Sequence, residues 1–254
     1  MNRLLRQAAQ LEKLAASVTG RCRSRAAPGG EEDLPVRVAH YHQGSPAWHT
    51  WRSKKMTASS SAVVMRANPN WNKKSWVDLA DMRRGVPEEP VSEFVRNMRE
   101  RGHLMERVIQ HRFLPRAFPA ALERGNYAAS LDGWCAPDLE WLEAKNHRAV
   151  KAPLLLGLQE RGHTGPEWRE LPGLIDDLLL FAPHIGWQLV HQAAVIGNDR
   201  ARCLLVSYHS SRAWAAAWYS SHELLKRWPD LEAEWKRYTA WEQRYRALKQ
   251  EELM

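Results

Sequence analysis

The sequence has few cysteines and no long apolar run. Its three cysteines, Cys22, Cys135 and Cys203, form no CxxC pair, which argues against a disulfide framework or a cysteine-based zinc site and favours a reducing compartment. No stretch of 18 apolar residues is present, so we expect no transmembrane helix and no membrane partner. An apolar secretory segment is also absent after the N-terminus, and we therefore expect a cytoplasmic protein.

Positive charge is in excess. The chain has 37 Lys and Arg residues against 29 Asp and Glu residues, a net charge of +8 and a pI near 9.6. Such a balance favours a polyanionic partner, most often nucleic acid, although an ordinary basic surface has the same composition. Part of the excess lies in residues 1–28, which contain six basic residues and one acid. An Arg-rich start is also typical of organellar transit peptides, the alternative location.

The 254 residues, 44% of them hydrophobic, are enough for one domain with appendages. We expect a basic tail and linker at residues 1–35, a globular core at 36–210 and a helical extension at 211–254. Apolar spacing predicts helices at residues 91–113, 184–197 and from Trp228 onward, and strands at residues 126–131, 140–145 and 201–208. Gly197 is a candidate C-cap for the second helix. This order indicates an α/β core with a small central sheet. The aromatic helix after Trp228 carries nearly balanced charge, which favours packing or an oligomer contact.

Two acidic residues occur at the ends of consecutive predicted strands. Ten residues separate Asp132 from Glu143, and Lys145 follows Glu143 by two positions. The pattern predicts a turn at Asp132 and Gly133. If the strands form a hairpin, the carboxylates meet at one end and need a cation, and Mg²⁺ prefers such oxygen ligands. Side chains at i and i+2 of a strand share a face, so Lys145 would project beside Glu143. Taken alone this spacing is weak, because exposed hairpins often carry similar charges.

Five short blocks, two of which contain these three residues, occur in a consistent order. They are QGSPAWHTWR at 43–52, TAS at 57–59, GHLME at 102–106, SLDG at 130–133 and LEAK at 142–145, followed by WQLVHQ at 187–192. Together they resemble the lambda-exonuclease/YqaJ viral recombinase family of the PD-(D/E)xK nucleases. Leu131 departs from the proline that this family has before its aspartate. The stretch after Tyr208 and the first 40 residues lie outside the resemblance.

The resemblance implies a fold and a role for each matching residue. The fold would be a restriction-endonuclease-like core, with a small central mixed β-sheet flanked by helices, and here a C-terminal amphipathic helix. Asp132, Glu143 and the Ala144 carbonyl would bind one or two Mg²⁺ ions, or Mn²⁺. Lys145 would orient the attacking water. The remaining implied site residues are Glu106 as an outer or second metal ligand, Gln188 near the water or Lys145, and Arg52, Ser59 and Ser130 around a DNA phosphate.

Simpler interpretations stay open for several of these residues. Glu106 fits a surface helix, Ser59 fits a helix N-cap, and Gln192, one turn after Gln188, competes for its role. The resemblance implies a Mg²⁺-dependent exonuclease that degrades linear duplex DNA 5′→3′, in a bacterium or phage-infected host, together with a single-strand annealing protein and as a homo-oligomer such as a trimer. The alternatives are an endonuclease on the same core and an inactive DNA-binding protein.

Overall fold

The computed structural model describes residues 36–39, 45–67, 76–86, 92–145, 173–210 and 213–251. The expected tail at residues 1–35 and the start of the first sequence block, residues 43–44, lie outside this range. The N-terminal elements are β1 (Arg37–Val38), α2 (Pro46–Ser53), β2 (Met56–Thr57), η1 (Ala58–Ser60), α3 (Ser61–Val64), α4 (Trp76–Arg83) and α5 (Glu93–Phe113). They are followed by β3 (Phe118–Arg124), β4 (Tyr127–Cys135), η3 (Ala136–Asp138), β5 (Glu140–Lys145), α7 (Ile175–Phe181), α8 (Pro183–Ile196), β6 (Arg202–Ser210), β7 (Ala213–Ser220), α9 (Ser221–Leu225) and α10 (Trp228–Glu251).

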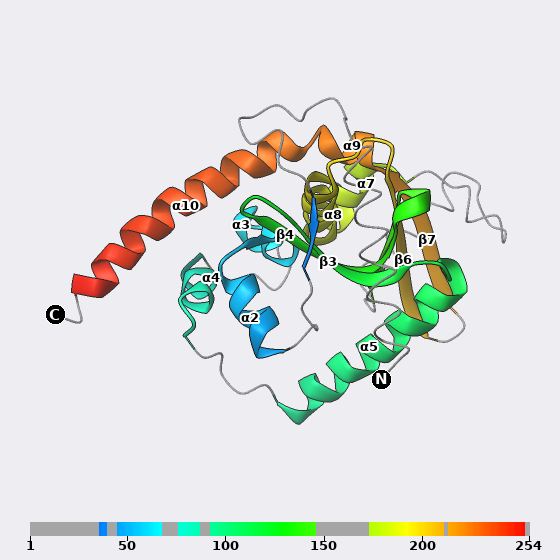
Figure 1. Cartoon of the computed structure of the whole chain (residues 1–254), viewed down its shortest axis with the longest axis horizontal. Helices are drawn as coiled ribbons and strands as arrows, with labels where there is room; N and C mark the ends of the chain where they lie inside the picture. The colour runs from blue at the N-terminus through cyan, green and yellow to red at the C-terminus, as the bar shows by residue number, and fades with distance from the viewer. Residues whose placement is uncertain are drawn as a thin grey trace.

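The strands form one mixed sheet in the order β1-β3-β4-β5-β6-β7, and β2 pairs with β4 off this path. The β3–β4, β4–β5 and β6–β7 pairs are antiparallel, whereas β5 and β6 run parallel. Parallel neighbours need a crossover, and α7 and α8 lie in the chain between them (Figure 1). The α/β class with a mixed central sheet is therefore confirmed.

Helices cover both faces of the sheet. On one face, α8 packs among the largest group of buried side chains, with Leu189, Val190 and Ala193 against the strands. On the other face, Ile109 and Phe113 of α5 cover Leu142 and Ala144 of β5. The α8 helix ends where Gly197 adopts a left-handed conformation (φ 61°), as the sequence predicts for its C-cap.

The C-terminal helix α10 packs against α8 through buried aromatic side chains. The Trp235 indole N–H donates to Nδ1 of His191 across 3.3 Å, and both side chains are fully buried. Burial lowers the pKa of His191 to about 3, so the neutral imidazole can accept this hydrogen bond. Figure 1 shows that α10 then runs away from the sheet, and Leu248 near its end is exposed. The balanced charge and the regularly spaced aromatic residues after Trp228 thus predict packing correctly for the first half of the helix.

Two features of the strands differ from the sequence-based expectation. Asp132 and Gly133 are not in a turn, because β4 continues through them to Cys135 and the chain reverses at residues 136–139 instead. The sheet also extends past residue 210 through β7, which pairs with β6. Its Ala-rich and Trp-rich sequence lacks the clean alternation that predicts a strand.

Within the part of the chain that the structure describes, no helix combines the length and the apolar character needed to cross a bilayer.

Candidate active site

The hairpin of β4 and β5 brings Asp132 and Glu143 to neighbouring positions. Its backbone ladder pairs Gly133 with Leu142 and continues toward the turn, but it stops before Asp132. There the Asp132 side chain takes the place of the backbone, because its Oδ2 accepts the Ala144 N–H at 2.8 Å. The strands therefore part where the carboxylates lie, and β5 continues beside β6.

A β-bulge in β4 places Asp132 at this point. Ala120 of β3 pairs with Leu131, whereas Phe118 pairs with Trp134, so β4 contains one residue more than β3 over this interval. Bulges re-aim side chains and are common beside active sites. Space beside Gly133 is tight, since a Cβ there would lie 3.1 Å from the Ala117 Cβ and 3.3 Å from the Leu142 Cβ, and these neighbours would have to shift.

The Glu143 carboxylate is buried and surrounded by donors. Its Oε1 forms an ion pair with the Lys145 ammonium and accepts a hydrogen bond of 2.8 Å from Nε2 of Gln188. Its Oε2 accepts a hydrogen bond of 2.6 Å from Nε2 of Gln192. Glu143 and Lys145 share one face of β5, as the i, i+2 spacing predicts, and that face meets α8. Both candidate glutamines thus contact the site.

Negative charge exceeds positive charge in this cluster. Burial and the nearby Glu143 carboxylate raise the pKa of Asp132 well above its usual range. Burial alone would lower the pKa of Lys145, but Glu143 and Asp132 raise it above its usual value, so the ammonium stays charged at neutral pH. One ammonium faces two carboxylates, and Glu106 adds a third acid within electrostatic reach. The site therefore favours an added cation.

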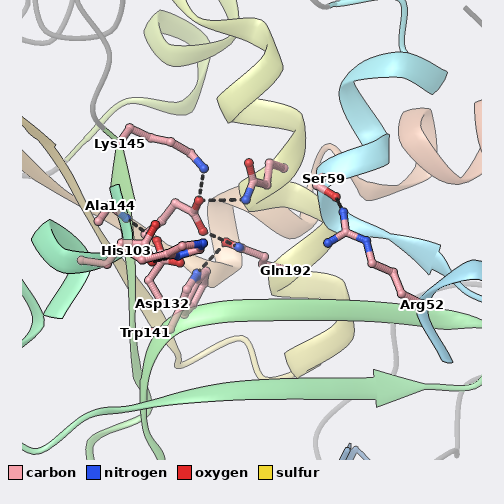
Figure 2. A network of polar contacts seen from close by, with 11 residues as sticks. Arg52, Ser59, His103, Asp132, Trp141, Ala144, Lys145 and Gln192 are labelled. Atoms are coloured by element: carbon pink, nitrogen blue, oxygen red, sulfur yellow. Dashed lines mark hydrogen bonds and ion pairs between the residues drawn. The ribbon is translucent and has the colours of Figure 1, made fainter. Parts of the chain in front are cut away.

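Glu106 reaches the cluster from α5 together with a histidine. Oε2 of Glu106 lies 3.1 Å from Nδ1 of His103, one helical turn earlier. Figure 2 labels His103 among the residues of this polar network. His103 was not predicted as a site residue, although its i, i+3 spacing to Glu106 places both on one helix face.

Two of the three predicted phosphate residues, Arg52 and Ser59, lie apart from Asp132 (Figure 2). The Arg52 guanidinium donates to the Ser59 hydroxyl and stacks on the Trp48 ring, 4.8 Å from its centroid. The Ser59 hydroxyl also lies 3.3 Å from that of Thr57. Ser130 pairs with Ala121 in the sheet. Arg52 and Ser59 therefore lie together, and Ser130 is placed separately in β4.

The donor set fits a magnesium ion bound through few protein ligands. Among the described residues, no three His, Cys, Asp or Glu side chains lie close enough together to hold a metal by themselves. Mg²⁺ is commonly held by one or two carboxylates, with water and substrate phosphate completing its shell. Asp132 and Glu143 supply two carboxylates in a cluster where, within the described structure, only one ammonium, that of Lys145, offsets their charge. The Ala144 side chain packs in the core and its N–H binds Asp132, while its carbonyl as a ligand stays a prediction.

Sequence reasoning missed a tryptophan that contacts the site through Gln192. The Trp141 indole N–H donates to Oε1 of Gln192 at 3.1 Å, and both residues are fully buried. Trp141 precedes Glu143 by two residues in a strand, so the alternation of β5 already places the two side chains on one face. What the sequence could not show is that Gln192 of α8 lies opposite them.

In this mixed sheet, an antiparallel hairpin carries an Asp on one strand and Glu-x-Lys on the next, at the point where the two strands separate. This arrangement defines the PD-(D/E)xK restriction-endonuclease-like fold. The chain is similar in structure to an alkaline exonuclease, LHK-Exo, from Laribacter hongkongensis, with 19% identity and a TM-score of 0.54 over 83% of this chain and 100% of that one. A second structure, LHK-Exo in complex with dAMP, matches with 18% identity and a TM-score of 0.55 over the same shares. No protein-family model and no curated protein matches the chain.

Proposed function

We propose that this protein is a Mg²⁺-dependent deoxyribonuclease that degrades linear double-stranded DNA from its ends. The convergence of Asp132, Glu143 and Lys145 at the opening of the β4–β5 hairpin carries the proposal. The net charge of +8 supports a polyanionic substrate. The structural similarity to an alkaline exonuclease supports an end-directed reaction.

In this proposal, water attacks the phosphorus and the bond to O3′ breaks, leaving a 3′-hydroxyl on the released nucleotide. Asp132 and Glu143 would hold the divalent cation, Mg²⁺ or Mn²⁺, which would supply Lewis-acid stabilisation of the charge that develops on the phosphate. Lys145 orients the attacking water and adds a positive charge beside it. Glu106, whose charge influences Asp132, would act on a second ion or its hydration shell.

The Arg52–Ser59 pair would bind the terminal 5′-phosphate, which sets a 5′→3′ direction. A guanidinium and hydroxyls suit a phosphate because they offer several charge-assisted hydrogen bonds. The 3′ single strand left behind would serve strand-annealing recombination with a single-strand annealing protein. A ring-shaped homotrimer around the duplex belongs to the same proposal, and a long exposed stretch of α5 is available for contacts.

The direct test compares a linear 5′-phosphorylated duplex with a covalently closed circular duplex of the same sequence. We expect Mg²⁺-dependent release of mononucleotides from the linear DNA, none after chelation of the metal, and an intact circle. Nicking or linearisation of the circle would establish an endonuclease instead. Binding without cleavage of either DNA, with Mg²⁺ or Mn²⁺, would reject a nuclease function.

Replacing Arg52 with alanine should raise KM for the 5′-phosphorylated duplex by about tenfold, with kcat changed little. One charge-assisted hydrogen bond contributes roughly 1.5–3 kcal/mol, of which solvent exposure removes a part. Arg66→Ala is the matched control, because Arg66 also stacks on a tryptophan, Trp76, 5.2 Å from its centroid. A KM unchanged in Arg52→Ala, or raised equally for a duplex with a 5′-hydroxyl, would place the phosphate elsewhere.

A further inference from the structure

The two oxygens of Glu143 are held by groups of different solvent exposure. Oε1 contacts the Lys145 ammonium, whose side chain is 25% exposed, and the partly buried Gln188 amide. Oε2 contacts only the Gln192 amide among the described residues, and Gln192 is completely buried. Lys145 and Gln188 can therefore move toward solvent, whereas Gln192 cannot.

Trp141 fixes the orientation of the Gln192 amide. An indole N–H is a donor and never an acceptor, so the Gln192 carbonyl must face Trp141. The amide NH₂ must then face Glu143. If the amide rotated by 180°, its carbonyl oxygen would face a carboxylate oxygen and its NH₂ would face an indole N–H, and both hydrogen bonds would be lost.

The elements that carry these groups are buried and packed on both sides. Trp141 lies in β5 between β4 and β6, paired with Trp134 on one side and Cys203 on the other. Gln192 lies in α8, where the flanking His191 and Ala193 are both buried. The two hydrogen bonds that join Trp141, Gln192 and Glu143 are thus anchored in β5 and α8 before any ligand binds.

We infer that the Trp141–Gln192 pair clamps Oε2 of Glu143 and so leaves Oε1 as the oxygen that binds the catalytic cation. Lys145 and Gln188 then leave Oε1 and turn toward the water and phosphate. Trp141 is a positioning residue in this scheme, since it acts on the cation only through Gln192 and Glu143. The inference rests on the proposed function, because it assigns roles within the same site.

The test measures Ca²⁺ binding to the full chain by calorimetry, without DNA. Loss of a partner that orients a metal ligand typically weakens metal binding 10–100-fold, so Trp141→Phe should weaken Ca²⁺ binding by about tenfold. Trp235→Phe is the matched control, because Trp235 is equally buried and donates its indole N–H to His191, the residue before Gln192. Both variants should lose thermal stability, but Trp235→Phe should keep its Ca²⁺ affinity within about twofold.

A second variant separates the clamp from simple core packing. Gln192→Met keeps the side-chain length but removes both hydrogen bonds, and it should weaken Ca²⁺ binding at least as much as Trp141→Phe. The double variant should bind Ca²⁺ no more weakly than Gln192→Met does, because the two residues act in series. If Trp141→Phe does not fold, Gln192→Met with Trp235→Phe as control still measures the clamp.

Three results would overturn the inference. Equal Ca²⁺ affinity in wild type and Gln192→Met would show that the clamp does not position the ligand. Equal weakening of Ca²⁺ binding in Trp141→Phe and Trp235→Phe would indicate a general loosening of the core instead. Additive losses of Ca²⁺ affinity in the double variant would show that the two residues do not act in series. A wild-type protein that binds neither Ca²⁺ nor Mg²⁺ would reject the proposed function as well, and this outcome is distinct from the first three.

Discussion

Replacing Lys145 with alanine should lower kcat on linear duplex DNA by on the order of 10²–10⁴-fold, the range for loss of a group that positions or activates a nucleophile. Its ammonium contacts Oε1 of Glu143 and has no positively charged substitute in the cluster of described residues. Because the two carboxylates raise its pKa, the charge is present throughout the neutral range. KM should change far less, since the group acts on the reacting atoms.

Lys55→Ala is the matched control for this variant. Lys55 also forms a carboxylate ion pair, 3.1 Å from Glu123, and its side chain is 20% exposed against 25% for Lys145. Removal of Lys55 should leave kcat within about twofold and affect only stability. Equal activity in wild type and Lys145→Ala, measured by single-turnover release of nucleotides, would reject the assignment of Lys145.

Much of the site could be predicted because it depends on short-range alternation within strands. Glu143 and Lys145 were expected on one face of β5, and the hairpin that joins them to Asp132 is present. The α8 helix and its glycine cap also follow from periodicity and conformational preference. Each of these features is determined by neighbours in the sequence.

The features that sequence reasoning missed depend on contacts between distant segments. The choice between Gln188 and Gln192 could not be made from the helix alone, because both occupy one face and both contact Glu143. The bulge at Asp132 is visible only through the register of β3 against β4. Trp141 acquires its partner from α8, which is 51 residues away in the chain.

Replacing Asp132 with asparagine should abolish activity and at the same time stabilise the protein in the absence of metal. Loss of a metal-binding carboxylate should lower kcat by on the order of 10³-fold. Asparagine keeps an oxygen that can accept the Ala144 N–H but removes the repulsion from Glu143, which contributes to the raised pKa of Asp132. The Tm of the metal-free variant should therefore rise by about 2–4 °C, or roughly 1 kcal/mol.

Asp138→Asn serves as the control for the stability effect. Asp138 lies 3.1 Å from the Arg116 guanidinium, so its carboxylate is compensated by a positive charge. Neutralising it should leave the Tm unchanged or slightly lower. A rise in Tm for Asp138→Asn equal to that for Asp132→Asn would show that the gain has nothing to do with crowded carboxylates.

Thermal melting with and without Mg²⁺ tests most directly whether the paired carboxylates hold a divalent cation. A ligand that binds only the folded state at about 100 times its dissociation constant stabilises it by about 2.7 kcal/mol. Saturating Mg²⁺ should therefore raise the Tm of the wild-type protein by about 5 °C or more, and leave that of Asp132→Asn within about 1 °C of its metal-free value. Equal Mg²⁺ shifts in the two proteins, or no shift in the wild type at any Mg²⁺ or Mn²⁺ concentration, would contradict a cation site between Asp132 and Glu143.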